Sequence, residues 1–276
     1  MLLCDSVERY APEDLEHYVI VSSDDEQLFR KSKRPRTKLL IQEKMVSGRY
    51  WKVPLLKNWR FSFSTPPIRG WIWQQLVKLS IPKFIESEAI LMLDSDTFLT
   101  RAFDPGDLVE IDAQSGRQTI PLFVEEKDFY VTHSDTQKWN AVSRSLLGLP
   151  PLSQPSRMGY VSCYAYWRRD VVLKLHEHIR SSSGKSNIVR ALAMHPTFSE
   201  YSLYGTFVDQ VLGRKNSGHY AFTKDIVHAY WQEKPLSAAD ILDFRRTQEP
   251  STFMAMINAK SETSVADIRS AFGFER

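Results

Sequence analysis

Residues 89–96 read AILMLDSD, and this stretch decides the fold that the sequence predicts. Its first five residues are all apolar, which is typical of a strand buried on both faces of a mostly parallel sheet. The strand runs directly into Asp94-Ser95-Asp96, and in open α/β sheets ligands bind beyond the carboxyl ends of the strands. The stretch therefore predicts an α/β protein with a mostly parallel, Rossmann-like sheet flanked by helices, and a ligand site where this strand ends.

Helices and strands alternate on both sides of this stretch. The spacing of apolar residues predicts helices over residues 1–10, 70–79, 168–182 and 199–213. Short apolar runs predict strands over residues 17–22, 38–42, 121–126, 131–135, 159–167 and 224–231. We expect an ordered loop over residues 45–70. Further helical segments follow Leu236, so we expect one large domain over residues 1–235 and a C-terminal helical extension over residues 236–276.

The composition is that of a soluble globular protein, with 42% hydrophobic and 25% charged residues. The formal net charge of +3 gives no broad basic surface, so nucleic acid is not an expected partner. Cys4 and Cys163 are far apart and support neither a disulfide framework nor a cysteine metal site, which favours a reducing compartment. No apolar run approaches the roughly 20 residues of a transmembrane helix. We therefore expect a cytoplasmic protein.

Asp94 and Asp96 are the sharpest functional signal. They lie two residues apart, so their carboxylates point to the same side of the chain, separated by about 6.6 Å at ~3.3 Å per residue. Such a pair can hold one hard cation, directly or partly through water, and leave positions for phosphate oxygens. The alternative is a strand-end loop in which either carboxylate only caps the next segment. The apolar strand before the pair favours the functional interpretation.

The segment 70–103, which contains this pair, resembles the bacterial proteins grouped as domain of unknown function 6492. More generally, residues 15–235 are similar to nucleotide-sugar glycosyltransferases of the GT-A fold, and among these to family 8. The resemblance implies that Asp94 and Asp96 coordinate a Mn²⁺ or Mg²⁺ ion that bridges the diphosphate of a UDP-type donor. The cation would neutralise the leaving diphosphate as the glycosidic bond breaks.

A third ligand is implied by residues 225–235, DIVHAYWQEKP, which are similar to the family 8 pattern of a histidine followed by Lys-Pro. By this likeness His228 would ligate the cation and Lys234 would contact diphosphate oxygens. Two aspartates and a histidine with open positions suit a hard to borderline cation that holds phosphate. The alternative is a core histidine beside Tyr230 and Trp231.

The predicted helix 199–213 carries two candidate catalytic carboxylates. Ser199 is its expected N-cap, and Glu200 lies in the first turn, where the helix dipole stabilises an ionised carboxylate. In inverting GT-A enzymes a carboxylate at a similar helix start is the general base, whereas Asp209-Gln210 resembles the Asp-Gln pair of retaining family 8 enzymes. The two likenesses imply opposite stereochemistry. The alternatives are a capping carboxylate for Glu200 and a solvated one for Asp209.

Two more segments supply candidate substrate contacts. The strand 159–167 resembles the acceptor-side strand of these enzymes. Gly159 would let the backbone approach the sugar, Ser162 would reach the donor sugar, and Tyr160 would stack on an acceptor ring. Aromatic residues at strand spacing are also typical of a core. On the helix 70–79, Gln75 and Lys78 share a polar stripe that either faces the Asp-x-Asp end of the sheet or is exposed to solvent.

The sequence departs from the GT-A pattern at its start. GT-A sheets begin with a strand and loop that hold the nucleobase, whereas this sequence opens with a helix, so the first strand of the fold is expected to be missing. The basic run over residues 30–38 is expected to be a solvated loop, or else a peripheral contact with anionic lipid or an acidic polysaccharide.

These observations predict a metal-dependent glycosyltransferase that moves a sugar from a nucleotide-diphosphate donor to a hydroxyl of a glycan or glycolipid acceptor. One alternative is a phosphatase similar to the haloacid dehalogenases, which also place Asp-x-Asp after an apolar strand. Another is an inactive glycan-binding pseudo-transferase, which the missing first strand would favour.

Overall fold

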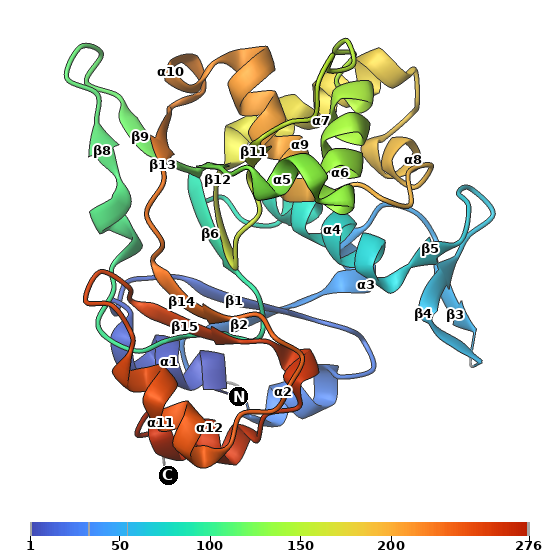
Figure 1. Cartoon of the computed structure of the whole chain (residues 1–276). Helices are drawn as coiled ribbons and strands as arrows, with labels where there is room; N and C mark the ends of the chain where they lie inside the picture. Colours follow the sequence, from blue (N-terminus) through green and yellow to red (C-terminus); the bar gives the residue numbers. More distant parts are fainter. Residues whose placement is uncertain (1, 33, 54, 275–276) are drawn as a thin grey trace. The chain divides into compact units, whose positions relative to one another are not determined.

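The computed structural model describes residues 2–32, 34–53 and 55–274, and the chain forms two compact units. The first unit comprises Met1–Leu40, Leu93–Leu108 and Lys224–Arg276. The second comprises Ile41–Met92 and Val109–Thr223. Segments near the two ends of the chain, blue and red in Figure 1, thus belong to the same unit.

The first unit contains a three-stranded mixed sheet in the order β14 (Val227–Tyr230), β15 (Met254–Ile257), β7 (Thr97–Leu99). Strand β15 runs parallel to β14 and antiparallel to β7. A separate pair joins β1 (His17–Val21) to β2 (Thr37–Ile41). The helical elements of this unit are α1 (Leu2–Tyr10), α2 (Glu26–Ser32), η2 (Pro105–Leu108), α11 (Ala238–Arg246), η4 (Ala259–Ser261) and α12 (Val265–Ala271).

The core of the first unit lies between the three-stranded sheet and helices α11 and α12, which Figure 1 shows on one side of β14 and β15. Side chains alternate along a strand, so Ala255 and Ile257 of β15 share a face, and Phe98 of β7 pairs with Ala255. All three pack with Ile241 of α11 and Phe272 after α12. The sheet is therefore held by apolar contacts with the C-terminal helices.

The described residues of the second unit form four small sheets. Strand β9 (Gln118–Phe123) lies between β13 (His219–Phe222), which is parallel to it, and β8 (Glu110–Ile111), which is antiparallel. The other strands of this unit pair as follows: β6 (Ala89–Leu93) with β12 (Tyr164–Arg168), β10 (Glu125–Glu126) antiparallel to β11 (Met158–Gly159), and β3 (Trp51–Val53), β4 (Leu56–Phe61) and β5 (Ile68–Arg69) in an antiparallel sheet.

Helices make up most of the rest of the second unit. They are α3 (Gln42–Met45), α4 (Gly70–Ser80), η1 (Ile81–Lys83), α5 (Phe129–Thr132), α6 (Ser134–Leu146), α7 (Arg169–Ser183), α8 (Ile188–Leu192), α9 (Glu200–Thr206), η3 (Phe207–Leu212) and α10 (Arg214–Ser217). The segment η3 is π-helical and continues α9 without a break.

The predicted helices are confirmed, and so are their buried faces. Ile72, Leu76 and Leu79 of α4 are buried, as the apolar stripe predicted. Ser199 caps α9 as expected, because its side chain accepts a hydrogen bond from the backbone nitrogen of Ser202. Gly213 has a φ of 77°, a conformation that glycine adopts without strain, and it ends the helical run at the predicted residue.

The α/β class is confirmed, but a mostly parallel Rossmann-like sheet is not what the structure shows. The sheets have two or three strands each, and most of the described strand pairs are antiparallel. Strand β6 alternates between buried and half-buried residues instead of being buried throughout. An all-apolar sequence is compatible with both patterns, since a half-buried position accepts an apolar residue as readily as a buried one.

Three local predictions were wrong. Residues 45–70 contain the strands β3, β4 and β5 instead of a loop. Residues 131–135 form the end of α5 and the start of α6 instead of a strand, and His133 between the two helices caps α6 through its side chain. Residues 236–276 are not wholly helical, since they include β15, the middle strand of its sheet. The boundary expected at residue 235 does not coincide with the two compact units, and as a domain boundary it stays a prediction.

Candidate functional site

The predicted Asp-x-Asp lies in a tight turn between β6 and β7. The backbone nitrogen of Thr97 donates to the carbonyl oxygen of Asp94 at 3.0 Å, which closes the turn. Oδ2 of Asp96 accepts a hydrogen bond from the backbone nitrogen of Ala259 at 3.1 Å, just beyond β15. Both aspartates are half-buried and Ser95 between them is exposed. The turn therefore presents two carboxylates at the surface of the first unit, and one of them is oriented by a backbone contact.

These carboxylates match the chemistry of the cation that the resemblance implies. Mg²⁺ and Mn²⁺ favour oxygen ligands, and Mg²⁺ typically takes only one or two carboxylates and completes its shell with water and phosphate oxygens. Two half-buried carboxylates in one turn suit that requirement. Asp94 and Asp96 are thus the residues that would hold the ion.

His228 lies elsewhere in the same sheet. His228 on β14 pairs with Ala255 on β15. The backbone carbonyl of Asp96 accepts a hydrogen bond from the backbone nitrogen of Ile257, which lies two residues further along β15. At ~3.3 Å per residue, Ala255 and Ile257 are about 6.6 Å apart along the strand. The imidazole packs on Phe244 of α11, with 4.2 Å between the ring centroids. Desolvation by this packing lowers the pKa of His228 from its usual value. The ring is therefore part of the contact between the sheet and α11.

The structure does not gather the predicted metal ligands into one group. Across residues 2–32, 34–53 and 55–274, no three His, Cys, Asp or Glu side chains are placed to hold a metal ion together. Lys234 is exposed in the loop after β14, where its carbonyl oxygen accepts a hydrogen bond from the Tyr230 hydroxyl at 2.9 Å. The roles of His228 and Lys234 stay predictions.

Glu200 is the first residue of α9 and is brought together with Gln75 and Lys78 of α4. Its backbone nitrogen donates to Oε1 of Gln75 at 3.0 Å, and its Oε1 lies 3.0 Å from Nζ of Lys78. Lys78 also donates to the Tyr201 hydroxyl at 2.9 Å. Glu200 is 3% exposed and Gln75 is 2% exposed. Of the two interpretations of the polar stripe, solvent exposure is excluded for Gln75, because this stripe packs against α9.

Within this cluster of Glu200, Gln75 and Lys78, the side chain of Gln75 has a hydrogen-bond donor that is not used. Gln75 uses its amide oxygen to bind α9, and its amide nitrogen Nε2 is buried without a hydrogen-bond partner among the residues that the structure describes. A buried donor without a partner carries a desolvation cost of about 1–3 kcal/mol. Such a group beside an ion pair is typical of a site that receives a further polar ligand or an ordered water.

Asp209 lies in the π-helical segment η3 and is fully engaged. Its Oδ2 accepts from the Tyr160 hydroxyl at 2.9 Å and from Nη2 of Arg214 at 2.8 Å, while Nε of Arg214 donates to Oδ1. Burial and the charge of Asp209 raise the pKa of Tyr160, which therefore stays a hydrogen-bond donor. Asp209 is not a solvated carboxylate, and in this arrangement it fixes the position of Tyr160.

Most other residues of the predicted acceptor strand are buried. A Cβ at Gly159 would lie 2.6 Å from the ring of Tyr130, so a small residue is required here by the packing of Tyr130. Ser162 and Trp167 are buried, and Trp167 stacks on Tyr204 with 4.8 Å between the ring centroids. Trp167 is therefore a core residue, whereas Tyr160 lines a cavity.

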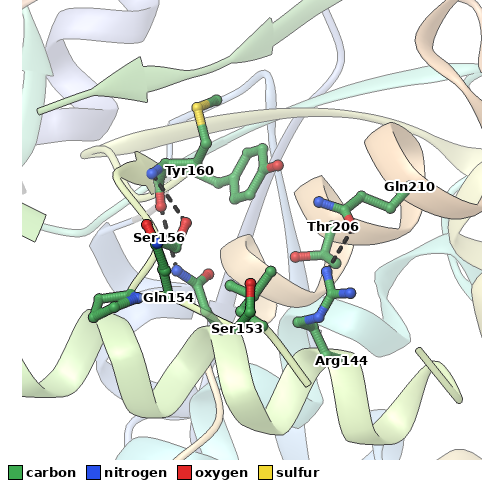
Figure 2. Close-up of a pocket in the computed structure, with 11 residues that line it drawn as sticks. Arg144, Ser153, Gln154, Ser156, Tyr160, Thr206 and Gln210 are labelled. Atoms are coloured by element: carbon green, nitrogen blue, oxygen red, sulfur yellow. Dashed lines mark hydrogen bonds between the residues drawn. The ribbon is translucent and has the colours of Figure 1, made fainter. Parts of the chain in front are cut away.

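This cavity lies in the second unit, and Figure 2 shows its lining. It has a volume of about 340 Å³ and lies between α6, the loop that follows α6, Tyr160 and the junction of α9 with η3. Arg144 and Gln210 meet on one side of it, where Nη1 of Arg144 donates to Oε1 of Gln210 at 2.6 Å. Tyr160 and Ser156 lie on the other side in Figure 2.

Sequence reasoning missed Arg144 and the loop of residues 152–156. Arg144 lies on a helix with many polar residues, where an arginine is ordinarily exposed, yet only 8% of it is accessible. It is covered by the loop after α6, whose Pro150 carbonyl accepts from its Nε at 2.6 Å. The sequence holds one indirect signal, since Gln210, the partner of Arg144, belongs to the Asp-Gln pair that the sequence singles out.

Much of the basic run over residues 30–38 is used within the chain. Arg30 pairs with Glu26, Arg34 pairs with Asp5, Lys38 pairs with Glu16, and Arg36 donates to the Pro12 carbonyl. Lys33 lies outside the described residues. These pairs leave few cations of the run for an anionic surface, and peripheral contact with lipid stays a prediction.

Of the two resemblances seen in the sequence, to domain of unknown function 6492 and to GT-A glycosyltransferases, the comparisons with known proteins support the first. A family model described as Family of unknown function (DUF6492) matches residues 1–272, which confirms the resemblance to domain of unknown function 6492. No curated protein matches the chain. The likeness to GT-A and family 8 glycosyltransferases stays a prediction. Within the described part of the chain, no helix combines the length and apolar character needed to cross a membrane, and the expected cytoplasmic location stays a prediction.

Proposed function

Because the chain belongs to this family, whose function is not known, we propose from its own residues that it transfers a sugar from a nucleotide-diphosphate donor, of UDP type, to a hydroxyl of a glycan or glycolipid. The observation that carries the proposal is the turn between β6 and β7, in which Asp94 and Asp96 present two half-buried carboxylates at the end of a largely apolar strand. A GT-A arrangement of the chain is part of this proposal.

The turn supplies the donor side of the chemistry. In the proposal, Asp94 and Asp96 hold Mn²⁺ or Mg²⁺, which supplies positive charge to the leaving diphosphate. The hydrogen bond from the backbone of Ala259 to Asp96 fixes one carboxylate before any ligand arrives. A carboxylate that is already oriented loses less conformational freedom on binding, which favours affinity.

Glu200 supplies the acceptor side. A general base must be ionised and within reach of the hydroxyl proton that it accepts. Glu200 begins α9, where the helix dipole favours the carboxylate form, and the nearby ammonium group of Lys78 does the same. We therefore propose Glu200 as the residue of the second unit that takes up the proton of the acceptor hydroxyl when the acceptor oxygen bonds to the sugar and the bond to the diphosphate breaks.

The contacts of Asp209 favour Glu200 over Asp209 as the base. Asp209 accepts two hydrogen bonds from Arg214 and one from Tyr160, so its oxygens are already occupied. We therefore assign Asp209 a positioning role, in which it orients Tyr160 at the cavity. With Glu200 as the base, the proposal is an inverting transfer.

A thermal-shift screen of nucleotide sugars, each with and without Mn²⁺, tests this proposal. A ligand that binds the folded chain raises the melting temperature by mass action. We expect one nucleotide sugar to raise it in the presence of Mn²⁺ and to have little effect without the ion. No shift with any nucleotide sugar, combined with release of phosphate from an aryl phosphate, would establish the phosphatase alternative instead. Glycan binding with no nucleotide binding would establish the pseudo-transferase.

A further inference from the structure

We propose that the cavity beside Tyr160 binds a sugar acid, meaning one monosaccharide unit that carries a carboxylate. That the ligand is a sugar rests on the proposed function. That it carries a negative charge rests on Arg144 alone and is independent of the proposed function.

Arg144 is a buried cation whose hydrogen-bond partners are neutral. Its Nε donates to the Pro150 carbonyl and its Nη1 to the amide oxygen of Gln210, both at 2.6 Å. Within the described residues, Arg144 forms no ion pair with a carboxylate, and Asp209, which binds Tyr160 of the cavity lining, is engaged by Arg214. A buried charge is costly unless an anion or several hydrogen bonds compensate it. An anion entering the cavity would supply the missing opposite charge.

The geometry of the guanidinium group selects the type of anion. Arginine presents a planar fork of five N–H donors that matches the two oxygens of a carboxylate. Two of these donors are used by Pro150 and Gln210, which leaves the outer part of the fork for the cavity. One arginine matches the single charge of a carboxylate better than the nearly double charge of a free phosphate. The volume of about 340 Å³ also exceeds what a lone inorganic anion needs, and it lies at the low end of the range for small-molecule sites.

The rest of the lining suits a ring with several hydroxyl groups. Gln154, Ser153 and Thr206 supply amide and hydroxyl groups that can both donate and accept, which is what sugar hydroxyls require. Met158, Leu152 and Pro155 supply apolar surface for the C–H face of a ring. A few placed polar groups among apolar ones are typical of small-molecule sites. Figure 2 shows Ser153 and Arg144 among the side chains that line the cavity.

Binding is measured by calorimetry on the full chain without nucleotide and without metal, with glucuronate, glucose and inorganic phosphate as probes. We expect glucuronate to bind at least about tenfold more tightly than glucose, since a hydrogen bond to a charged group contributes more than a neutral one. Added salt should weaken glucuronate binding. Equal binding of glucuronate and glucose would overturn the assignment of an anion, and binding of phosphate alone would overturn the assignment of a sugar.

A matched pair of variants locates the ligand. Ser153 is exposed at the cavity and can be replaced without removing a buried contact. Ser153→Glu places a carboxylate where it competes for Arg144, whereas Ser153→Gln adds the same bulk without charge. We expect Ser153→Glu to weaken glucuronate binding about tenfold more than Ser153→Gln does. Equal effects of the two variants would show that Arg144 does not receive the anion.

Arg144 itself is tested with Arg144→Gln, against Arg157→Gln as a control for the loss of one positive charge. Arg157 follows the cavity loop but pairs at the surface with Asp128. We expect only Arg144→Gln to abolish glucuronate binding, and the variants at Ser153 keep the test valid if Arg144→Gln does not fold. Because no nucleotide is present, a failure here leaves the proposed transfer standing. Conversely, a failure of Mn²⁺-dependent UDP binding leaves this site standing.

Discussion

Nζ of Lys78 lies 3.0 Å from Oε1 of Glu200, and this ion pair joins α4 to the first residue of α9. The side chain of Lys78 is 21% exposed and that of Glu200 is 5% exposed. At such depth the two charges depend on each other, because removal of one takes away the opposite charge that pairs with the other. The pair therefore has a structural consequence as well as the proposed catalytic one, and the two can be separated by substitution.

The catalytic consequence is tested by Glu200→Gln. The amide keeps the size of the side chain but accepts no proton, so we expect transfer to fall by about 10²–10⁴-fold while donor binding is retained. Steady-state turnover and donor calorimetry on the same sample measure the two effects. Glu177→Gln is the control, since Glu177 is an exposed helical glutamate paired with Arg180. Unchanged turnover in Glu200→Gln would remove Glu200 as the base.

The structural consequence is tested by Lys78→Met. This variant leaves a carboxylate buried without its cation, and we expect it to lower the free energy of unfolding by about 2 kcal/mol, at the lower end for a broken buried pair because Lys78 is partly exposed. Urea denaturation measures the change. The double variant Lys78→Met/Glu200→Gln should recover part of the loss, because the buried charge is gone. A double variant as unstable as the sum of the single ones would show that the ion pair is not the cause.

The contact between Gly205 and Tyr160 is a second structural test. A Cβ at Gly205 would lie 2.2 Å from Cδ1 of Tyr160, near the base of a buried ring that Asp209 holds by its hydroxyl. Overpacking of this kind typically costs about 1–3 kcal/mol, more than the roughly 1 kcal/mol that alanine gains over glycine in a helix. We expect Gly205→Ala to lower the urea midpoint. The same substitution made in a Tyr160→Leu background should cost less, and an equal cost there would contradict the proposed contact.

Burial of His219 should make the free energy of unfolding depend on pH, and the direction of this dependence can be predicted. Its Nε2 lies 2.9 Å from the Tyr204 hydroxyl, and burial lowers the pKa of His219 to about 4. The unfolded chain takes up a proton near pH 6.5 and the folded chain only near pH 4, so between these values the unfolded state binds more protons and stability falls as the pH falls. We expect His219 to account for about 2 kcal/mol of lost stability between pH 7 and pH 5.

Urea unfolding of His219→Gln at pH 5, 6 and 7 tests this expectation. The variant should show a shallower dependence on pH than the wild type. Burial also lowers the pKa of His176 to about 4, so the variant should retain part of the slope. An identical slope in wild type and variant would show that His219 does not carry this proton linkage.

The elements that the sequence predicted well are those with a local signal. The stripe of Ile72, Leu76 and Leu79 predicted α4 and its buried face, because the helical spacing of these apolar residues can be recognised within the eleven residues of the helix. Strand β15, MAMI over residues 254–257, has no such signal. It belongs to a five-residue apolar run, residues 253–257, between two helices, and only its pairing with β14 and β7 makes it the middle of a sheet. Pairing between segments so distant in sequence depends on the tertiary structure.

The site divides in the same way. The sequence singles out Asp94 and Asp96 because a strand and a turn are adjacent in it, and their role stays a prediction. The contact of Glu200 with Gln75 was only half predicted, since the polar stripe of α4 had two interpretations. Arg144 was missed altogether. An arginine on a polar helix is ordinarily a surface residue, and only the loop that folds over it turns it into a buried cation at a cavity.

The most direct test of the proposed function is calorimetry of UDP binding with and without Mn²⁺, on wild type and on Asp94→Asn/Asp96→Asn. Asp24→Asn/Asp25→Asn removes the same charge from an exposed loop and serves as the control. We predict that wild type and control bind UDP in a Mn²⁺-dependent manner and that the Asp94/Asp96 variant loses at least about tenfold in affinity, a difference of roughly 1.4 kcal/mol. Mn²⁺-dependent binding that is unchanged in the Asp94/Asp96 variant would contradict the account.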